Sequence, residues 1–252
     1  MRVLFIVGYW NSGTTLLVRI LRHHSRLKLR KTFNSKNLEE HTIRRILKKF
    51  NKDFFFFGDY RDVIQNGFKN YEEPCLNDEE TKKFRKLFYK KLRVPKDKIL
   101  FLKKPRIFFF KNFLDRTFPK GEMKKIVILR NGFSQVVSKD YWKNSPAEPK
   151  KQLLRRAHFW YRAMEYYFNN WHNDPETLCL RYESLCNNPE RELRRICDFA
   201  EISFEEIREH IPEGLESRMD KWEKLNDDLK NEVEKIIGEM QKKLDKELPV
   251  QP

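Results

Sequence analysis

Cysteine motifs and long apolar runs are both missing from this sequence. The four cysteines, Cys75, Cys179, Cys186 and Cys197, form no C-x-x-C pair, and no cysteine–histidine cluster has the spacing of a zinc site. We therefore expect buried thiols in a reducing cytoplasm, and no metal. No stretch reaches transmembrane length, and the apolar run VLFIV near the N-terminus is too short for the core of a signal peptide. We expect it to be a buried strand.

Acidic residues are also scarce relative to basic ones. The 53 Lys and Arg against 37 Asp and Glu give a formal net charge of +16. This excess favours an anionic ligand, an acidic acceptor, nucleic acid or an anionic membrane surface, although lysine-rich surfaces also occur without such a partner. The 21 phenylalanines predict a core built on rings and exclude a disordered chain.

The start of the chain predicts a strand, a glycine-containing loop and a helix. Residues 2–7 form a short run that is apolar after Arg2, as in a strand buried in a parallel sheet, and residues 14–23 have helical periodicity. The loop between them reads GYWNSGTT, and the free N–H groups of a helix start favour an anion there. It lacks the lysine of nucleoside triphosphatase loops, which makes that class a poor fit. An ordinary strand–helix turn is the alternative.

Two cations follow predicted strands further along the chain. Lys103 comes after a strand over residues 98–102, and Arg130 ends the buried run KIVIL, residues 125–129. Ligands of open α/β sheets bind at the carboxyl ends of strands. A buried strand that ends in arginine is costly without an anion, and Ser138 on the next helix can add a hydrogen bond. A basic surface turn at Lys103 and an ion pair at Arg130 are the alternatives.

The remaining segments continue the alternation of strands and helices. Residues 177–181 predict another short strand, and the run of four phenylalanines at 54–57 is compatible with a strand or a buried helix end. Residues 24–52 are basic and helical in pattern. The predicted helices cover residues 39–50, 78–91, 108–118, 133–142, 152–171, 189–200 and 227–248. Together these segments predict an α/β fold with a parallel sheet and helices on both faces.

In this order, the motifs resemble the sulfotransferase superfamily. The matching pieces are GYWNSGTTLL, LKKPRIFFF, IVILRNGFSQVVSKDYW, LRYESLCNNPERELRRICDFAEI and KWEKLNDDLKNEVEKIIGEM. Each piece is moderately specific, but five in family order over nearly the whole chain make a chance match improbable. The resemblance implies a P-loop-like α/β fold and transfer of a sulfuryl group to an acceptor hydroxyl or amine. The implied donor is 3′-phosphoadenosine 5′-phosphosulfate, and no metal is implied.

The resemblance assigns roles at the sulfate end of the donor. It places four loop residues around the 5′-phosphosulfate: Ser12, Gly13, Thr14 and Thr15. Lys103 corresponds to the lysine that steadies the bridging oxygen as the sulfuryl group leaves.

The resemblance also assigns residues to the other end of the nucleotide. Arg130 and Ser138 correspond to residues that hold the 3′-phosphate. Tyr182 is expected near the nucleotide, with Arg181 beside it. Ser217 corresponds either to a late nucleotide-binding serine or to a plain helix cap.

Two departures from the family pattern concern catalysis. Many relatives carry Lys or Arg before the S/T-G-T-T run, whereas this chain has Asn11, which brings no charge to the sulfate. The general base is also not evident. Its leading candidates are His41, Glu39 and Asp59, and the others are His23, His24, Glu40 and Asp62.

The acceptor cannot be named from the sequence. We expect one domain over residues 1–252, with about 31–98 forming a helical insertion that covers the acceptor as a flap. The net charge favours an anionic acceptor. A nucleotide-binding relative without catalysis, and a basic RNA-binding protein that uses aromatic and basic runs such as KKFNKDFFFF, are the alternatives. A small-molecule kinase would need a loop lysine and a metal-holding carboxylate, which the sequence does not show.

Overall fold

The core of the protein is a five-stranded parallel sheet. The computed structural model describes residues 2–29, 42–52, 73–93, 95–138, 149–217 and 219–251, with the side chains of Arg106 and Pro149 excepted. The strands are β1 (Val3–Val7), β2 (Leu27–Leu29), β3 (Ile99–Lys103), β4 (Met123–Leu129) and β5 (Thr177–Arg181). Their spatial order is β2-β3-β1-β4-β5, and every neighbouring pair is parallel. All strand carboxyl ends therefore meet at one edge of the sheet.

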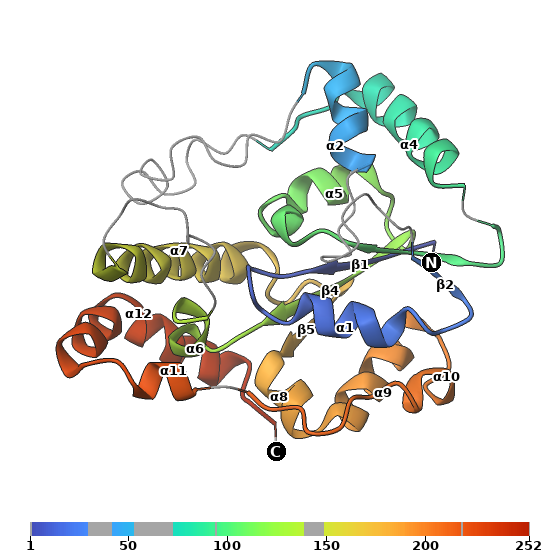
Figure 1. Cartoon of the computed structure of the whole chain (residues 1–252). Helices are drawn as coiled ribbons and strands as arrows, with labels where there is room; N and C mark the ends of the chain where they lie inside the picture. The colour runs from blue at the N-terminus through green and yellow to red at the C-terminus, as the bar shows by residue number, and fades with distance from the viewer. Residues whose placement is uncertain are drawn as a thin grey trace.

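Helices cover both faces of this sheet, which confirms the predicted α/β fold. One face carries α2 (Thr42–Leu47), η1 (Lys48–Phe50), α4 (Asp78–Leu92), η3 (Pro105–Phe109), α5 (Lys111–Thr117), α6 (Gly132–Val136), α7 (Pro149–Asn170) and α12 (Asp227–Glu247). The other face carries α1 (Thr14–Leu21), α8 (Tyr182–Asn187), α9 (Pro189–Ala200) and α10 (Glu205–Arg208). The short helix α11 (Asp220–Glu223) precedes α12. Figure 1 shows α2, α4 and α5 on one side of the strands and α1, α8, α9 and α10 on the other.

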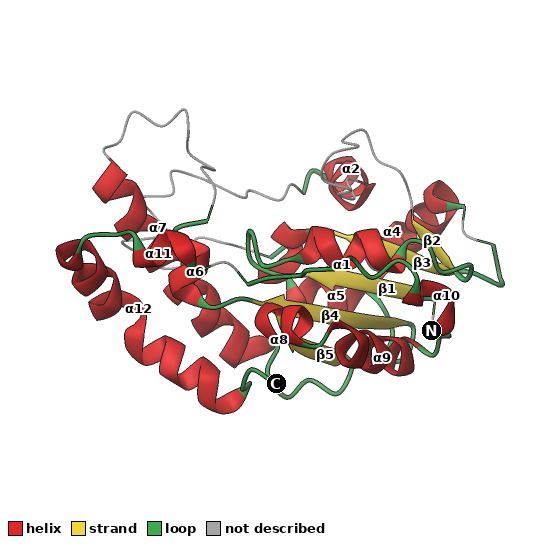
Figure 2. Cartoon of the chain, turned by 60° about the horizontal axis from the view of Figure 1, so that its bottom comes forward, coloured by secondary structure: helices red, strands yellow, loops and turns green. Residues whose placement is uncertain are grey.

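The two-residue periodicity of β1 divides the core into two clusters. Val3, Phe5 and Val7 pack with the α4–α7 face, whereas Leu4 and Ile6 pack with the α1–α9 face. All five side chains are fully buried, as expected of a central strand in a two-faced sheet. Figure 2 shows the strands from another side, with α8 and α9 beside β4 and β5. The rigid centre fixes where the loop after β1 begins.

The secondary structure departs from the sequence predictions at several points. The predicted basic helical segment contains the edge strand β2, whose three residues are too few to show a period and which forms by pairing with β3. The predicted helix 108–118 is divided at Phe110 into η3 and α5, because residues 107–110 are all buried and carry no periodicity. Helix α8 within the RYESL run was not predicted.

Helix α6 is shorter than the predicted helix 133–142. It ends at Val136, and the chain turns at Val137 and Ser138, while residues 139–142 lie outside the described part. The guanidinium of Arg156 on α7 donates to the carbonyls of Val136 and Ser138 at 3.0 and 3.3 Å. This side chain satisfies carbonyls that a longer helix would have bonded itself. The four-phenylalanine run at 54–57 also lies outside the described residues.

Candidate active site

The loop after β1 lies at the carboxyl edge of the sheet and adopts two unusual backbone conformations. Asn11 has a φ of 58° and Gly13 a φ of 102°, both in the left-handed region. Asparagine and glycine are the residues that enter this region at low cost. The two turns bring the chain from β1 directly into α1, which begins at Thr14 without a side-chain cap. The N–H groups of its first turn are therefore available to a bound anion.

A side chain at position 13 would not fit this loop. A Cβ built on Gly13 would collide with the ring of Tyr182, which lies at the start of α8. The loop backbone and the Tyr182 ring are thus packed against each other without an intervening side chain. Burial is the main cause that raises the pKa of Tyr182, to about 12. The phenol is therefore neutral near pH 7.

Ser12 supplies a polar group in the loop that suits an anion. Its side chain is fully buried, and its Oγ has no hydrogen-bond partner among the described residues. A buried hydroxyl without a partner costs about 1–3 kcal/mol. The unpartnered Oγ and the uncapped N-terminus of α1 lie in one loop, so the residues present fit a phosphate or sulfate group.

Lys103 joins this loop from the neighbouring strand. It is the last residue of β3, its side chain is only 3% exposed, and its Nζ donates to Thr15 Oγ1 at 2.6 Å. Because β3 and β1 are adjacent and parallel, the carboxyl end of β3 lies next to the start of the loop. Lys103 therefore makes a direct contact with the first turn of α1.

Arg130 approaches the same loop from the other side, at the end of β4. Its guanidinium carbon lies 4.7 Å from the centre of the Tyr182 ring, and Nη1 donates to the carbonyl of Asn11 at 3.2 Å. Its Nε donates to Ser134 Oγ at 3.0 Å. Stacking on an aromatic ring fixes the plane of a guanidinium and leaves N–H groups at its edge able to donate to other acceptors. Arg130, Tyr182 and the loop thus form one cluster.

Ser134, rather than Ser138, is the serine that contacts Arg130. The Oγ of Ser138 donates to the carbonyl of Gln135 at 2.7 Å, within its own turn. Ser134 lies four residues after Arg130, at the start of α6, and the sequence analysis missed it. The only signal available was that spacing, which places a side chain one helical turn beyond the arginine.

The other predicted residues divide between the site and its surroundings. The Oγ of Ser217 is buried and has no hydrogen-bond partner within the described ranges. Arg181 was expected beside the nucleotide. It is 2% exposed, and its guanidinium forms ion pairs with Glu183 and Asp245.

Most candidates for the general base lie outside the described part of the chain. Glu39, Glu40, His41, Asp59 and Asp62 lie outside the described residues.

His23 and His24 follow the end of α1, the helix that starts at the loop and is about 12 Å long. The ring of His23 stacks on His210 with centroids 3.7 Å apart. The Nε2 of His24 accepts from the backbone N–H of Ser203 at 3.1 Å. Neither histidine faces the loop.

A buried network holds the turn that carries Arg130. The N–H of Asn131 donates to Glu183 Oε1 at 2.8 Å, and the other carboxylate oxygen of Glu183 accepts from Arg181 Nε at 3.2 Å. Glu183 and Arg181 flank Tyr182, the residue on which Arg130 stacks. The two residues thus connect the turn after β4 with the turn after β5.

The C-terminal helix α12 closes this network into a ring. Gln241 is buried, its Oε1 accepts from the N–H of Gly132 at 2.7 Å, and its Nε2 donates to Asp245 Oδ1 at 2.8 Å. The same oxygen of Asp245 accepts from Arg181 Nη1 at 2.8 Å. A Cβ on Gly132 would meet Trp160 at 2.8 Å, so glycine is also required for this close packing. The ring fixes the residues immediately after Arg130.

Replacing Gln241 tests whether this ring positions Arg130. In Gln241→Ala the N–H of Gly132 loses its acceptor, and we expect affinity for adenosine 3′,5′-bisphosphate to fall about three- to tenfold. Gln241→Glu keeps the acceptor for Gly132 but loses the donor to Asp245 and places two carboxylates side by side, so it should recover only part of the loss. Lys242→Ala, the exposed neighbour on the same helix, is the control. Calorimetry that finds parent affinity in Gln241→Ala, with only a lowered Tm, would assign the ring to stability alone.

Neither a metal cluster nor a membrane span is found in the described part of the chain. No group of three or more His, Cys, Asp or Glu side chains there could hold a metal ion. Among the same residues, no helix combines the length and the apolar character needed to cross a bilayer.

Comparison with known protein families finds a match over most of the chain. The family model described as the sulfotransferase family matches residues 4–206. A comparison with curated protein sequences finds no match.

Several solved structures share the fold at low sequence identity. The sulfotransferase domain of the Synechococcus PCC 7002 olefin synthase is 16% identical, with 95% of this chain and 94% of that chain covered and a TM-score of 0.53. The sulfotransferase domain from the curacin biosynthetic pathway is 18% identical, with 95% and 97% covered and a TM-score of 0.55. A sulfotransferase from Alicyclobacillus acidocaldarius is 14% identical, with 100% and 97% covered and a TM-score of 0.57.

Proposed function

This chain belongs to the sulfotransferase family and is a sulfotransferase enzyme, and we propose that it transfers a sulfuryl group from 3′-phosphoadenosine 5′-phosphosulfate to an acceptor hydroxyl or amine. In this reaction the bond between sulfur and the bridging oxygen breaks and a bond to the acceptor oxygen or nitrogen forms. The acceptor proton passes to a base, and adenosine 3′,5′-bisphosphate leaves. The observation that carries the proposal is the convergence of Lys103 and Arg130 on the loop after β1.

The loop supports binding of the 5′-phosphosulfate. The N–H groups at the start of α1 and the unpartnered Oγ of Ser12 are donors without a protein acceptor in the described part. Gly13 allows the backbone to approach a ligand, and Thr14 and Thr15 stand at the first two helical positions. These donors are fixed in advance, so they hold anionic oxygens without reorganising.

Lys103 is proposed to stabilise the charge that develops on the bridging oxygen. Its Nζ is held by Thr15 Oγ1 beside the loop, which restricts a flexible side chain to one place. In a buried setting, a fixed cation stabilises developing negative charge more strongly than it would in water. Lys103 therefore carries the main electrostatic role, because Asn11 brings no charge.

Arg130 is proposed to bind the 3′-phosphate. Its guanidinium is oriented by Tyr182 and Ser134, and a phosphate can accept from such a fork at two points. Ser217, with its buried and unpartnered Oγ, is a further donor. Ser138 can donate to the phosphate only after its hydroxyl leaves the carbonyl of Gln135.

The proposal for the acceptor site follows the prediction from the sequence. We propose that residues 1–252 form one domain and that residues 31–98 cover the acceptor. His41, Glu39 or Asp59 is proposed as the general base that takes the acceptor's proton. Within that range, α2 and α4 are anchored to the sheet, because they bury Ile43, Ile46, Phe84 and Phe88 in the core. The net charge of +16 supports an anionic acceptor.

A cytoplasmic location is also proposed. It is supported by the four cysteines, which are all unpaired although Cys75 is exposed.

Titration with adenosine 3′,5′-bisphosphate, followed by an acceptor screen with labelled donor, tests the function. Stoichiometric binding and label transfer would support it. Binding without any transfer would favour the alternative of a nucleotide-binding relative that has lost catalysis. No binding of the bisphosphate, together with RNA binding that weakens steeply with salt, would favour the RNA-binding alternative.

Adding a cation at Asn11 tests whether the site is under-charged. We expect Asn11→Lys to raise turnover about two- to tenfold, because the new charge would stand in the loop beside the transferred group. The left-handed backbone at position 11 should make this variant about 1 kcal/mol less stable. Asn11→Gln imposes the same backbone strain without a charge, and it should be less stable without any gain. If Asn11→Lys and Asn11→Gln turn over equally, a charge at position 11 does not stabilise the transition state.

A further inference from the structure

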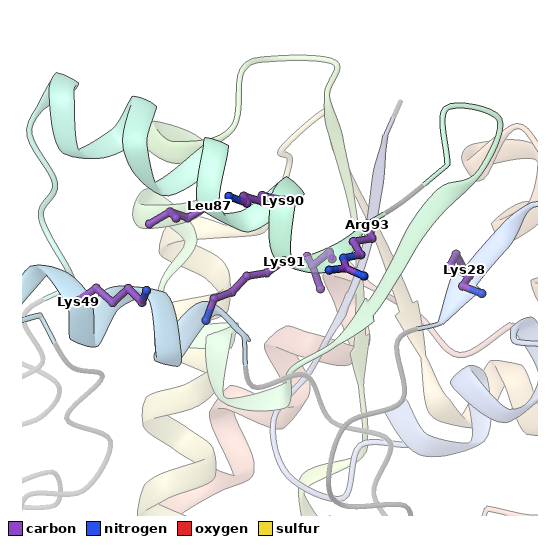
Figure 3. Close-up of a pocket in the computed structure, with 7 residues that line it drawn as sticks. Lys28, Lys49, Leu87, Lys90, Lys91 and Arg93 are labelled. Carbon is purple, nitrogen blue, oxygen red and sulfur yellow. The ribbon is translucent and has the colours of Figure 1, made fainter.

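A second concentration of positive charge lies beside β2, the edge strand of the sheet. A cavity of about 710 Å³ opens there between β2, η1 and the end of α4. It is lined by Lys28, Lys49, Leu87, Lys90, Lys91, Leu92 and Arg93. Figure 3 shows Lys91 reaching from α4 toward the helix that carries Lys49, with Arg93 lying between α4 and Lys28. Among the described residues, five cations and no carboxylate therefore line this cavity.

Four of the five cations of this cavity have no partner among the described residues. The side chains of Lys28, Lys49, Lys90 and Arg93 make no hydrogen bond or ion pair with any described residue. Elsewhere on the surface, cations do meet carboxylates, as in Lys124–Glu201 at 2.6 Å. Like charges gathered without a partner repel one another, and an anion would remove this repulsion.

The position of α4 explains only part of the cluster. Lys90 and Lys91 stand in the last turn of α4, where the helix dipole favours cations, and its acidic residues are all in the first turn. The dipole gives no reason for Lys28 on β2 or Lys49 on η1 to face the same cavity. Three elements separated in the sequence thus bring their cations together.

The cavity is separate from the donor site. None of its lining residues belongs to the loop, and Arg93 precedes the amino end of β3, whereas Lys103 stands at the carboxyl end. Five residues of strand separate those ends by roughly 13 Å. A ligand in the cavity would therefore lie toward the opposite edge of the sheet from the sulfuryl group.

We propose that this cavity is a binding site for a small polyanion that carries two or more phosphate or sulfate groups. Its volume falls in the range of small-molecule sites. The cations lie on both sides of the cavity, so one anionic group cannot reach all of them, whereas a ligand with several can. Arg93 offers a planar fork to one group, the lysines offer point charges to others, and Leu87 and Leu92 give the ligand an apolar floor.

Binding of two chemically distinct probes tests the proposal and identifies the anionic group. Inorganic tripolyphosphate and a sulfated disaccharide are titrated by calorimetry into protein saturated with adenosine 3′,5′-bisphosphate, and again into Arg130→Ala. We expect one equivalent of at least one probe to bind in both settings. The probe that binds more tightly shows whether phosphate or sulfate is the preferred group. The site is thereby tested whether or not the bisphosphate occupies the donor site.

Charge reversal with a matched control separates this cavity from general attraction. Lys49→Glu with Lys90→Glu should weaken binding by about tenfold or more. Lys120→Glu with Lys235→Glu changes the net charge equally at exposed positions outside the cavity and should leave affinity within about twofold. If the reversed pair does not fold, Lys49→Gln with Lys90→Gln should show a smaller loss in the same direction. Equal losses in both pairs, displacement of the probe by the bisphosphate, or no binding of either probe would overturn the proposal.

Discussion

Lys103→Ala is expected to lower turnover by roughly two to four orders of magnitude, the scale for removing one fixed electrostatic donor. The affinity for adenosine 3′,5′-bisphosphate should stay close to that of the parent, because Arg130 and the loop carry that binding. The loss should therefore appear in kcat, since Lys103 acts on charge that develops only as the sulfuryl group leaves. Single-turnover kinetics with saturating donor measures this step directly.

Two variants make the Lys103 experiment specific. Lys98 precedes the same strand at its other end, and Lys98→Ala should turn over like the parent enzyme. Thr15→Val removes the hydroxyl that holds Nζ but keeps the lysine, so its loss should be smaller than that of Lys103→Ala. If a folded Lys103→Ala variant turns over like the parent, Lys103 has no catalytic role and only packs against α1.

The loop and its neighbours were predictable because their signals are local. The apolar run before Gly8, the helix start after it and the buried run KIVIL each lie within a few residues. Parallel strands then bring Lys103, the loop and Arg130 to the same edge of the sheet, whatever else the chain does. That rule of topology is why three separate motifs could be expected to form one site.

The parts that the sequence did not reveal depend on partners far along the chain. Strand β2 has three residues and forms only because β3 lies beside it. Gln241 meets the N–H of Gly132 across 109 positions, so no local pattern could link α12 to Arg130. Arg181 was assigned to the nucleotide from its place next to Tyr182. Its guanidinium is instead paired with Asp245 on α12, 64 positions further along the chain, which no local pattern shows.

Asn11 shows how a structure can alter the meaning of a departure from a family pattern. In the sequence it is a missing charge. In the structure it is also a residue in the left-handed conformation, whose carbonyl accepts from Arg130. Asparagine suits that conformation better than lysine does. Position 11 therefore links the loop to the cluster around Arg130 through its backbone, independently of its side chain.

Arg130→Ala is expected to weaken binding of adenosine 3′,5′-bisphosphate by about 2–4 kcal/mol, or roughly 30- to 900-fold. The guanidinium is proposed to donate two hydrogen bonds to the 3′-phosphate. Because Tyr182 and Ser134 already orient it, its removal loses a contact that needs little further ordering of the side chain. Arg130→Lys keeps the charge but neither the fork nor the stacking, and it should lose an intermediate amount. Tyr182→Phe keeps the ring beneath the guanidinium and should lose little. With saturating donor, Arg130→Ala should regain most of its turnover, because the 3′-phosphate takes no part in bond breaking. Calorimetry that finds unchanged affinity in a folded Arg130→Ala would remove Arg130 from the nucleotide site, and it would leave the cluster with Tyr182 as a structural contact between β4 and α8.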